Sequence, residues 1–426
     1  MTVFRGLFID CPQDPFAGGA LRALEGALLV TDGTITRRGS FEELSREHPG
    51  EEVVDLRGGL VLPGLVDTHV HYPQVRVIGG LGLPLLEWLD QRALPEEARL
   101  ADAGYAAVIA REFLGSLVRA GTTSALVFGA HFPAAMDVFF AEAAASGLRI
   151  ASGLVVSDRG LPQPLLTSPD RAVADAVALA ERWHDVGRLR YAVTPRFSFS
   201  CGDAMLAACG EARSAIPGSL FTSHVNENHD EIARVVADFG THYVGSYDRH
   251  GLLDERSVLA HNVHPGDEEL AVLAGRGSAV AHCPCSNAAL GSGLFPLRRH
   301  LDAGVPVTLG SDVGGGVSFS LLREGLQAAF GQLQRGADGV RLGAQHLLWL
   351  ATAAGARALG LPEVGALSVG LQFDALWLRP PAGSTLDIAL RHAKDETDAV
   401  AKAFALGDTG DVRAVWVAGA PVVPPA

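Results

Sequence analysis

The chain has 426 residues, of which 48% are hydrophobic and 19% charged, so its composition is that of a globular protein and excludes an intrinsically disordered one. A formal net charge of −14 and a pI near 5.5 would repel a phosphate backbone, which argues against duplex nucleic acid as the main partner and favours a small, neutral substrate. The apolar run at residues 347–356 is too short to span a bilayer, and the first residues lack the pattern of an export signal. We therefore expect a cytoplasmic protein that has no membrane partner.

Cysteine and lysine usage narrows the chemistry further. The five cysteines are widely spread and odd in number, so we expect reduced thiols and no disulfide framework. Lysine occurs only at Lys394 and Lys402, and arginine supplies the other 32 of the 34 basic residues. A mechanism that needs a lysine in the centre of the fold is therefore excluded.

In chain order, the first 62 residues predict a small β layer. Apolar segments at residues 3–9, 26–31 and 53–56 are typical of strands, and Asp32-Gly33 is a turn signal after the second of them. Turn residues at Gly58-Gly59 and Pro63-Gly64 separate this layer from the central part of the chain.

From residue 63 to about residue 357, short apolar strands alternate with longer amphipathic segments, which is the pattern of βαβ units. Eight strands are predicted, at residues 64–69, 124–128, 149–155, 190–194, 220–224, 257–261, 278–282 and 306–310. Eight parallel strands close a barrel, so the predicted fold class is α/β with a (β/α)8 TIM-type barrel.

Two further strands are predicted near the C-terminus, at residues 373–378 and 412–417. Together with the N-terminal strands they predict one small, discontiguous β-sandwich domain. The expected division is residues 1–62 and 370–426 for this domain, and residues 63–369 for the barrel.

Histidine and aspartate residues recur where the predicted barrel strands end. His69 and His71 end the first strand, and alternation along a strand puts both side chains on one face. His224 ends the fifth strand, His261 the sixth, and Asp312 follows the eighth. Any one of them could be an ordinary buried polar group, but the carboxyl ends of barrel strands meet at the face where such enzymes build their sites. The set therefore predicts a metal site at the barrel mouth.

Nitrogen and carboxylate ligands suit Zn²⁺, although Fe²⁺ accepts a similar set. Zinc lowers the pKa of its bound water to about 7, so that no serine or cysteine nucleophile is needed. Glu227 lies three residues after His224, where a carboxylate could carry protons between the water and a substrate nitrogen. The competing interpretation of Glu227 is a solvated charge near the start of a helix.

Six segments resemble the amidohydrolase superfamily, and within it the enzymes that deaminate guanine. They are Pro-Gly-Leu-Val-Asp-Thr-His-Val-His-Tyr-Pro-Gln at residues 63–74, Leu-Leu-Glu-Trp-Leu at 85–89, Val-Thr-Pro-Arg-Phe at 193–197, His-Val-Asn-Glu-Asn at 224–228, His-Cys-Pro through Gly-Ser-Gly at 282–293, and Gly-Ser-Asp-Val-Gly-Gly-Gly at 310–316. The resemblance spans the whole predicted barrel. One departure is Ser311, where the superfamily more often has threonine, a change that keeps the hydroxyl group.

The resemblance implies a role for each matching residue. It implies one zinc ion per subunit, held by His69, His71, His224 and Asp312. Glu227 would be the proton shuttle, and Asp312 would also accept a proton from the attacking water. His261 would hydrogen-bond that water or the tetrahedral adduct.

The resemblance also implies a substrate pocket. Gln74 and Arg196 would read the polar edge of a purine, because a fixed guanidinium can donate to a carbonyl oxygen and a ring nitrogen together. Phe197 and Trp88 would lie against the ring face. Four more residues would touch the substrate while serving the metal or the protons, namely His71, His224, Glu227 and Asp312.

The implied activity is zinc-dependent hydrolytic deamination of guanine to xanthine and ammonia, in a homodimer. Alternatives are deamination of 8-oxoguanine, a pterin, a triazine or cytosine, or a non-catalytic relative. The lack of a lysine near residues 193–196 disfavours a two-metal site bridged by a modified lysine. Cys283-Pro284-Cys285 and His229-Asp230-Glu231 do not form a cytidine-deaminase zinc motif, which needs two cysteines spaced by two residues.

Overall fold

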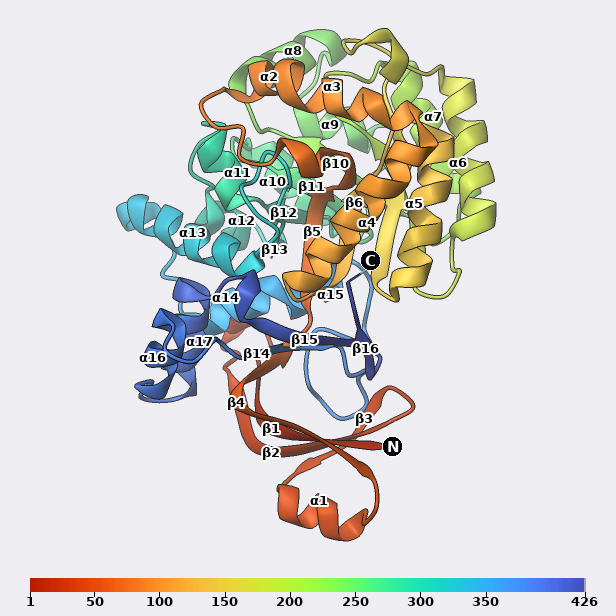
Figure 1. Cartoon of the computed structure of the whole chain (residues 1–426). Helices are drawn as coiled ribbons and strands as arrows, with labels where there is room; N and C mark the ends of the chain where they lie inside the picture. Colours follow the sequence, from red (N-terminus) through yellow and green to blue (C-terminus); the bar gives the residue numbers. More distant parts are fainter. Residues whose placement is uncertain (425–426) are drawn as a thin grey trace.

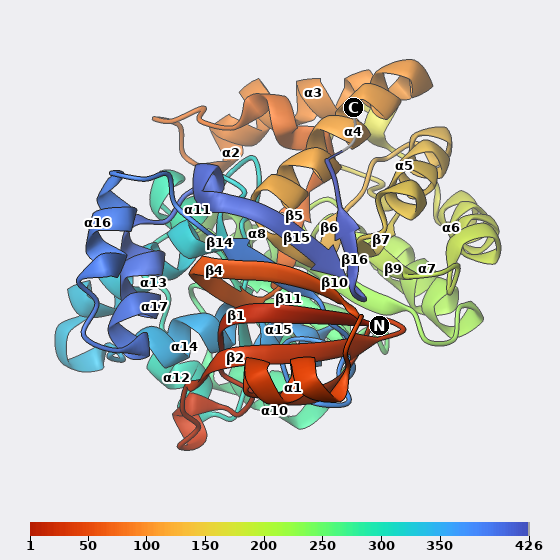
Figure 2. The ribbon, with the colours of Figure 1, turned by 60° about the horizontal axis from the view of Figure 1, so that its bottom comes forward.

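The computed structural model describes residues 1–424, and it contains two separate sheets (Figure 1). One sheet has seven strands and combines both ends of the chain, in the order β16-β15-β14-β4-β1-β2-β3. Its strands are β1 (Thr2–Asp10), β2 (Arg22–Thr31), β3 (Thr34–Gly39), β4 (Glu52–Pro63), β14 (Ala375–Leu378), β15 (Val412–Val417) and β16 (Ala420–Val422). Figure 2 brings this sheet to the front, and the two ends of the chain meet in it where β4 pairs with β14 in antiparallel orientation.

The second sheet is the barrel. Its strands are β5 (Leu65–His71), β6 (Thr122–Phe128), β7 (Arg149–Gly153), β8 (Val155–Val156), β9 (Leu189–Pro195), β10 (Leu220–Val225), β11 (Ser257–His261), β12 (Ala279–His282) and β13 (Val307–Leu309), paired in parallel. Hydrogen bonds just beyond the last strand bring β13 back to β5: Asp312 N donates to His69 O at 2.8 Å, and His71 N donates to Val313 O at 2.9 Å. All eight predicted barrel strands and the fold class are confirmed.

Helices cover the outside of the barrel (Figure 1). The longer ones are α4 (Ala103–Arg119), α5 (Pro133–Ser146), α6 (Pro169–Trp183), α7 (Asp203–Ala215), α8 (His229–Phe239), α10 (Asp267–Arg276) and α13 (Leu321–Gln334). The shorter ones are α1 (Phe41–Glu47), α2 (Leu85–Trp88), α3 (Leu94–Ala98), α9 (Tyr243–Asp248), α11 (Pro284–Ala289), α12 (Leu297–Asp302), α14 (Ala344–Ala351) and α15 (Ala353–Ala358). No helix among residues 1–424 is long and apolar enough to cross a membrane.

The C-terminal segment contains two helices in a region where the sequence predicted only strands. α16 (Thr385–Arg391) and α17 (Glu396–Leu406) lie between β14 and β15. Each begins after a residue whose side chain accepts a hydrogen bond from the first helical turn, Ser384 for α16 and Asp395 for α17. Leu386, Val400 and Phe404 are buried, so packing adds to this local capping signal. The domain limits at residues 62/63 and 369/370 stay predictions.

Candidate active site

Four side chains from three strand ends converge at the mouth of the barrel. Asp312 Oδ1 lies 3.2 Å from His69 Nε2 and 3.3 Å from His71 Nε2. His71 Nε2 lies 3.2 Å from His69 Nε2 and 3.3 Å from His224 Nε2. Ligand atoms held about 2.0–2.1 Å from zinc in a tetrahedron stand about 3.3–3.4 Å apart, so this spacing fits a shared divalent cation.

His261 belongs to the same group at a slightly greater distance. Metal-binding atoms of His69, His224, His261 and Asp312 all lie within 4.8 Å of one another. His261 Nε2 is 3.9 Å from Asp312 Oδ2 and 3.4 Å from Glu227 Oε2. His261 therefore faces both the four converging atoms and the carboxyl group of Glu227.

The protonation states suit a cation. Burial lowers the pKa of His71 to about 4, and burial lowers the pKa of His69 and of His224 as well, so the three rings are neutral near pH 7. Burial by itself would raise the pKa of Asp312, but hydrogen bonds from His69 and His71 hold it well below its ordinary value. Neutral imidazoles and an ionised carboxylate are the forms that bind metal.

Neighbouring groups orient two of the rings. His224 Nδ1 donates to the carbonyl oxygen of Arg196 at 2.6 Å, and His261 Nδ1 donates to Asn287 Oδ1 at 3.0 Å. A proton on Nδ1 leaves the lone pair of Nε2 directed at the centre of the site. Sequence reasoning missed the role of Asn287, although the residue lies within the 282–293 segment that it singled out.

The backbone after three barrel strands is left-handed at non-glycine residues. The φ angles are 49° at Asn226, 71° at His261, 45° at Asn262 and 47° at Asp312. Such angles are costly for side-chain-bearing residues and persist where surrounding contacts enforce them. Asn226 Nδ2 donates to Asn262 Oδ1 at 2.9 Å, which ties the turns after β10 and β11 together below the site.

Asp67 links two segments that carry residues of the site by accepting hydrogen bonds from both. Its Oδ1 accepts from Ser311 N at 3.0 Å and from His69 N at 3.2 Å, and its Oδ2 accepts from Ser311 Oγ at 2.5 Å. The hydroxyl group, which Ser311 shares with the threonine more common at this position, therefore donates to Asp67. These bonds hold the end of β5 against the turn that carries Asp312.

Glu227 is buried at the site, with 3% of its surface exposed, and lies before α8, whose N-cap is Asn228. Ser292 Oγ donates to Glu227 Oε1 at 3.1 Å. Burial, and then the charge of Asp312, raise the pKa of Glu227 to about 8. The competing interpretation of a solvated helix charge is therefore wrong, and Glu227 is a buried acid that can carry a proton near neutral pH.

One cavity gathers the remaining predicted residues. Its lining consists of His71, Gln74, Leu85, Trp88, Leu89, Arg196, Phe197, His224, Glu227, His261, Leu290 and Asp312. Every residue predicted to touch a substrate lines it, and the leucines and aromatic rings supply apolar walls for a flat heterocycle. The cavity adjoins the four converging atoms, because His71, His224 and Asp312 belong to both.

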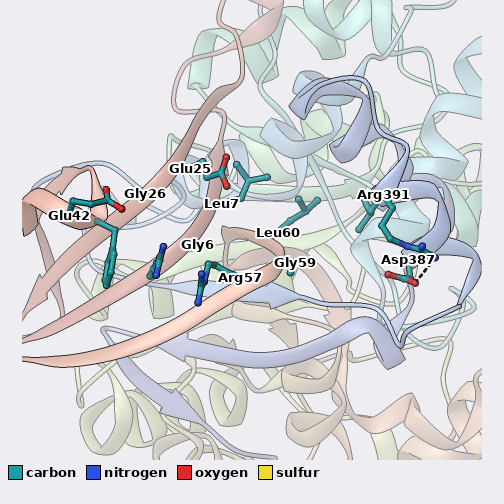
Figure 3. Close-up of a pocket in the computed structure, with 14 residues that line it drawn as sticks. Gly6, Leu7, Glu25, Gly26, Glu42, Arg57, Gly59, Leu60, Asp387 and Arg391 are labelled. Carbon is teal, nitrogen blue, oxygen red and sulfur yellow. Dashed lines mark ion pairs between the residues drawn. The ribbon is translucent and has the colours of Figure 1, made fainter. Parts of the chain in front are cut away.

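A much larger hollow lies away from the barrel mouth, between the seven-stranded sheet and α16 (Figure 3). It has a volume of about 690 Å³. Three of its charged side chains are in ion pairs: Asp387 pairs with Arg391 at 3.2 Å, and Arg57 pairs with Asp55 at 2.6 Å. No histidine or cysteine among residues 1–424 lines it. Size therefore does not identify the chemical site in this protein.

Fold and site together define a barrel hydrolase with a group of side chains that could hold a metal ion. The chain belongs to the amidohydrolase family, which matches residues 60–422. It is 58% identical to the probable guanine deaminase of Deinococcus radiodurans, over 98% of each chain. Among solved structures, E. coli guanine deaminase superimposes with a TM-score of 0.95 at 34% identity over 100% of both chains. Guanine deaminase from C. acetobutylicum with bound guanine in its active site superimposes with a TM-score of 0.91 at 26% identity over 99% of both chains.

Proposed function

We propose that this chain is a guanine deaminase that uses one Zn²⁺ per subunit to convert guanine and water to xanthine and ammonia. The observation that carries the proposal is a single cavity in which a metal-ligand set and a buried acid face a wall formed by Arg196, Gln74 and Phe197. The names of the relatives at 58% and 34% identity support the same substrate.

His69, His71, His224 and Asp312 would hold the ion, because each has a binding atom within 3.3 Å of another member of the set, whereas His261 Nε2 is 3.9 Å from Asp312 Oδ2. Their binding atoms are also unprotonated near pH 7. Zinc bound there would lower the pKa of its water to about 7 and so supply hydroxide at neutral pH. His261 lies beside this set and would hydrogen-bond the oxygen that adds to the substrate.

The protein groups then move the protons. Glu227, protonated near pH 7 because of its burial, donates to the ring nitrogen N3 while water adds at C2. Asp312 accepts one proton from the attacking water and passes it to the exocyclic amine, which leaves as ammonia. The second proton of that water goes to Glu227 as the C2 carbonyl of xanthine forms, so both carboxyl groups return to their starting states. Arg196 and Gln74 bind the polar edge of the ring, and Phe197 and Trp88 contact its face.

The test is a substrate and metal comparison on one preparation. We expect chelation to abolish ammonia release from guanine and one equivalent of Zn²⁺ per chain to restore it. His250→Gln, which changes a histidine paired with Asp203 on the outside of the barrel, is the matched control and should behave as the wild type. Two equivalents of metal, or restoration by Fe²⁺ alone, would contradict the proposed cofactor.

The same preparation separates the substrate candidates. Turnover of 8-oxoguanine, a pterin, a triazine or cytosine in place of guanine would overturn the substrate assignment while keeping the deaminase chemistry. No turnover of any of these amines would favour a non-catalytic relative. We further propose a cytoplasmic homodimer, which light scattering of the purified protein tests for its oligomeric part.

A further inference from the structure

Glu97 is a buried carboxylate next to the active-site cavity that belongs neither to the metal-ligand set nor to the cavity lining. It lies in α3, which with α2 covers the top of the barrel in Figure 1. Only 2% of its surface is exposed, and no motif in the sequence pointed to it.

Both carboxylate oxygens of Glu97 contact other side chains of the protein. Oε1 accepts from Gln74 Nε2 at 2.7 Å and from Arg196 Nη1 at 2.8 Å. Oε2 accepts from Arg196 Nη1 at 2.6 Å and faces His131 Nε2 at 3.2 Å. Burial by itself would raise the pKa of Glu97, but Arg196 and His131 hold it well below its ordinary value, so the group is an anion.

These contacts decide which atoms of Arg196 and Gln74 are left for a ligand. Arg196 uses Nη1 for Glu97, whereas its Nε and Nη2 bond no residue among 1–424. Gln74 turns its oxygen to Gly314 N at 2.9 Å and its nitrogen to Glu97, which settles the orientation of the amide. The polar atoms available at this wall of the cavity are therefore N–H donors.

We propose that Glu97 is a positioning residue that makes this wall donor-only, and that the pocket thereby selects a heterocycle with a carbonyl oxygen at this edge. The inference rests on the proposed function. In guanine the O6 and N7 atoms of one edge are both acceptors, whereas a 6-amino purine presents a donor beside N7. An amine at C6 would meet the N–H groups of Arg196 and leave donors on both sides unpaired.

The experiment compares guanine with 2,6-diaminopurine, which carries the same 2-amine but has an amine in place of the carbonyl oxygen at C6 and no hydrogen on N1. We first measure kcat/KM for two reactions of the wild-type protein with Zn²⁺: guanine to xanthine, and 2,6-diaminopurine to isoguanine. The quantity compared between variants is the ratio of the first kcat/KM to the second. For Glu97→Gln we expect kcat/KM for guanine to fall by about 10–100-fold and the ratio to fall by about tenfold or more, because Arg196 loses its fixed anion. Glu97→Asp keeps the charge and should restore part of the ratio.

Glu96→Gln is the matched control. Glu96 lies in the same helix and is also buried, with 7% of its surface exposed, but it bonds Tyr105 and Arg99 instead of the cavity residues. It should leave the ratio unchanged, and thermal unfolding shows whether each variant is folded. If Glu97→Gln is unfolded, Glu97→Asp is the test variant. We then expect its ratio to be lower than that of the wild type.

The outcomes separate this inference from the proposed function. A wild type that does not turn over guanine overturns the proposed function and the inference with it. The other outcome is a folded Glu97→Gln protein that loses activity or thermal stability and keeps the wild-type ratio. That result would contradict the inference, because a merely structural carboxylate would behave in this way, but it would not contradict the proposed function.

Discussion

The carbonyl oxygen of Arg196 accepts a hydrogen bond from His224 Nδ1 at 2.6 Å, so the residue whose side chain faces the cavity also orients a ring of the metal-ligand set. The backbone of Arg196 is itself anchored, since its N–H donates to Val156 O at 3.0 Å. One residue directly after β9 thus links the position of a cavity wall to that of a candidate metal ligand.

Glu227→Gln should lower kcat for guanine by about 10²–10⁴-fold without lowering the zinc content, because the amide keeps the shape but cannot transfer a proton. Steady-state kinetics and metal analysis check this. Glu269→Gln is the control, since Glu269 is also buried but bonds the backbone N–H groups of Val244 and Gly266 and does not line the cavity. A Glu227→Gln protein with wild-type kcat would remove the shuttle role.

Arg196→Lys should lower kcat/KM for guanine by about 10–100-fold, mainly through a higher KM, because lysine lacks the planar fork that can serve Glu97 and a ligand together. Arg159→Lys is the control, because Arg159 bonds Ser198 O and Asp238 and does not line the cavity. Equal KM values for the two variants would contradict the binding role.

Gly310→Ala should weaken zinc binding and lower the free energy of unfolding by about 1–3 kcal/mol. A Cβ atom at Gly310 would lie 2.8 Å from the Cβ of His69 and 3.1 Å from Cys283 Sγ, so His69 would have to shift. Urea unfolding and metal titration measure the two effects. Gly275→Ala is the control, because nothing lies within 4 Å of a Cβ atom added at Gly275 in α10. It should keep the zinc affinity and raise the free energy of unfolding by up to about 1 kcal/mol.

Glu231→Gln should reduce the loss of stability that occurs between about pH 5 and pH 8. Burial, and then repulsion from Glu227, raise the pKa of Glu231 from 4.5 to about 8 in the folded state. The folded chain therefore holds more protons than the unfolded chain between these values, so the free energy of unfolding falls as pH rises from about 5 to about 8. The variant should lose less stability over this range, by on the order of 1–3 kcal/mol.

Urea unfolding at several pH values, with the metal content held constant, gives this difference. Parallel curves of free energy against pH for the wild type and Glu231→Gln would show that Glu231 ionises alike in both states. The comparison does not depend on the substrate, so it stands apart from the kinetic tests.

The order of the barrel strands and the convergence of His69, His71, His224, His261 and Asp312 could be predicted because both depend on local pattern. A short apolar strand ends where polar residues begin, and the carboxyl ends of parallel barrel strands meet at one face. Knowing that each residue ends a strand was therefore enough to place them together.

The tertiary structure alone decided how Glu97 meets Gln74 and Arg196 at one wall of the cavity. Glu97 is 23 residues from Gln74 and 99 residues from Arg196, and it ends no strand, so no periodic pattern ties the three together. Local hydrophobic period tells which face of a segment is buried but not which partner it meets. The same limit applies to α16 and α17, whose caps can be read in the sequence but whose packing depends on residues far away in the chain.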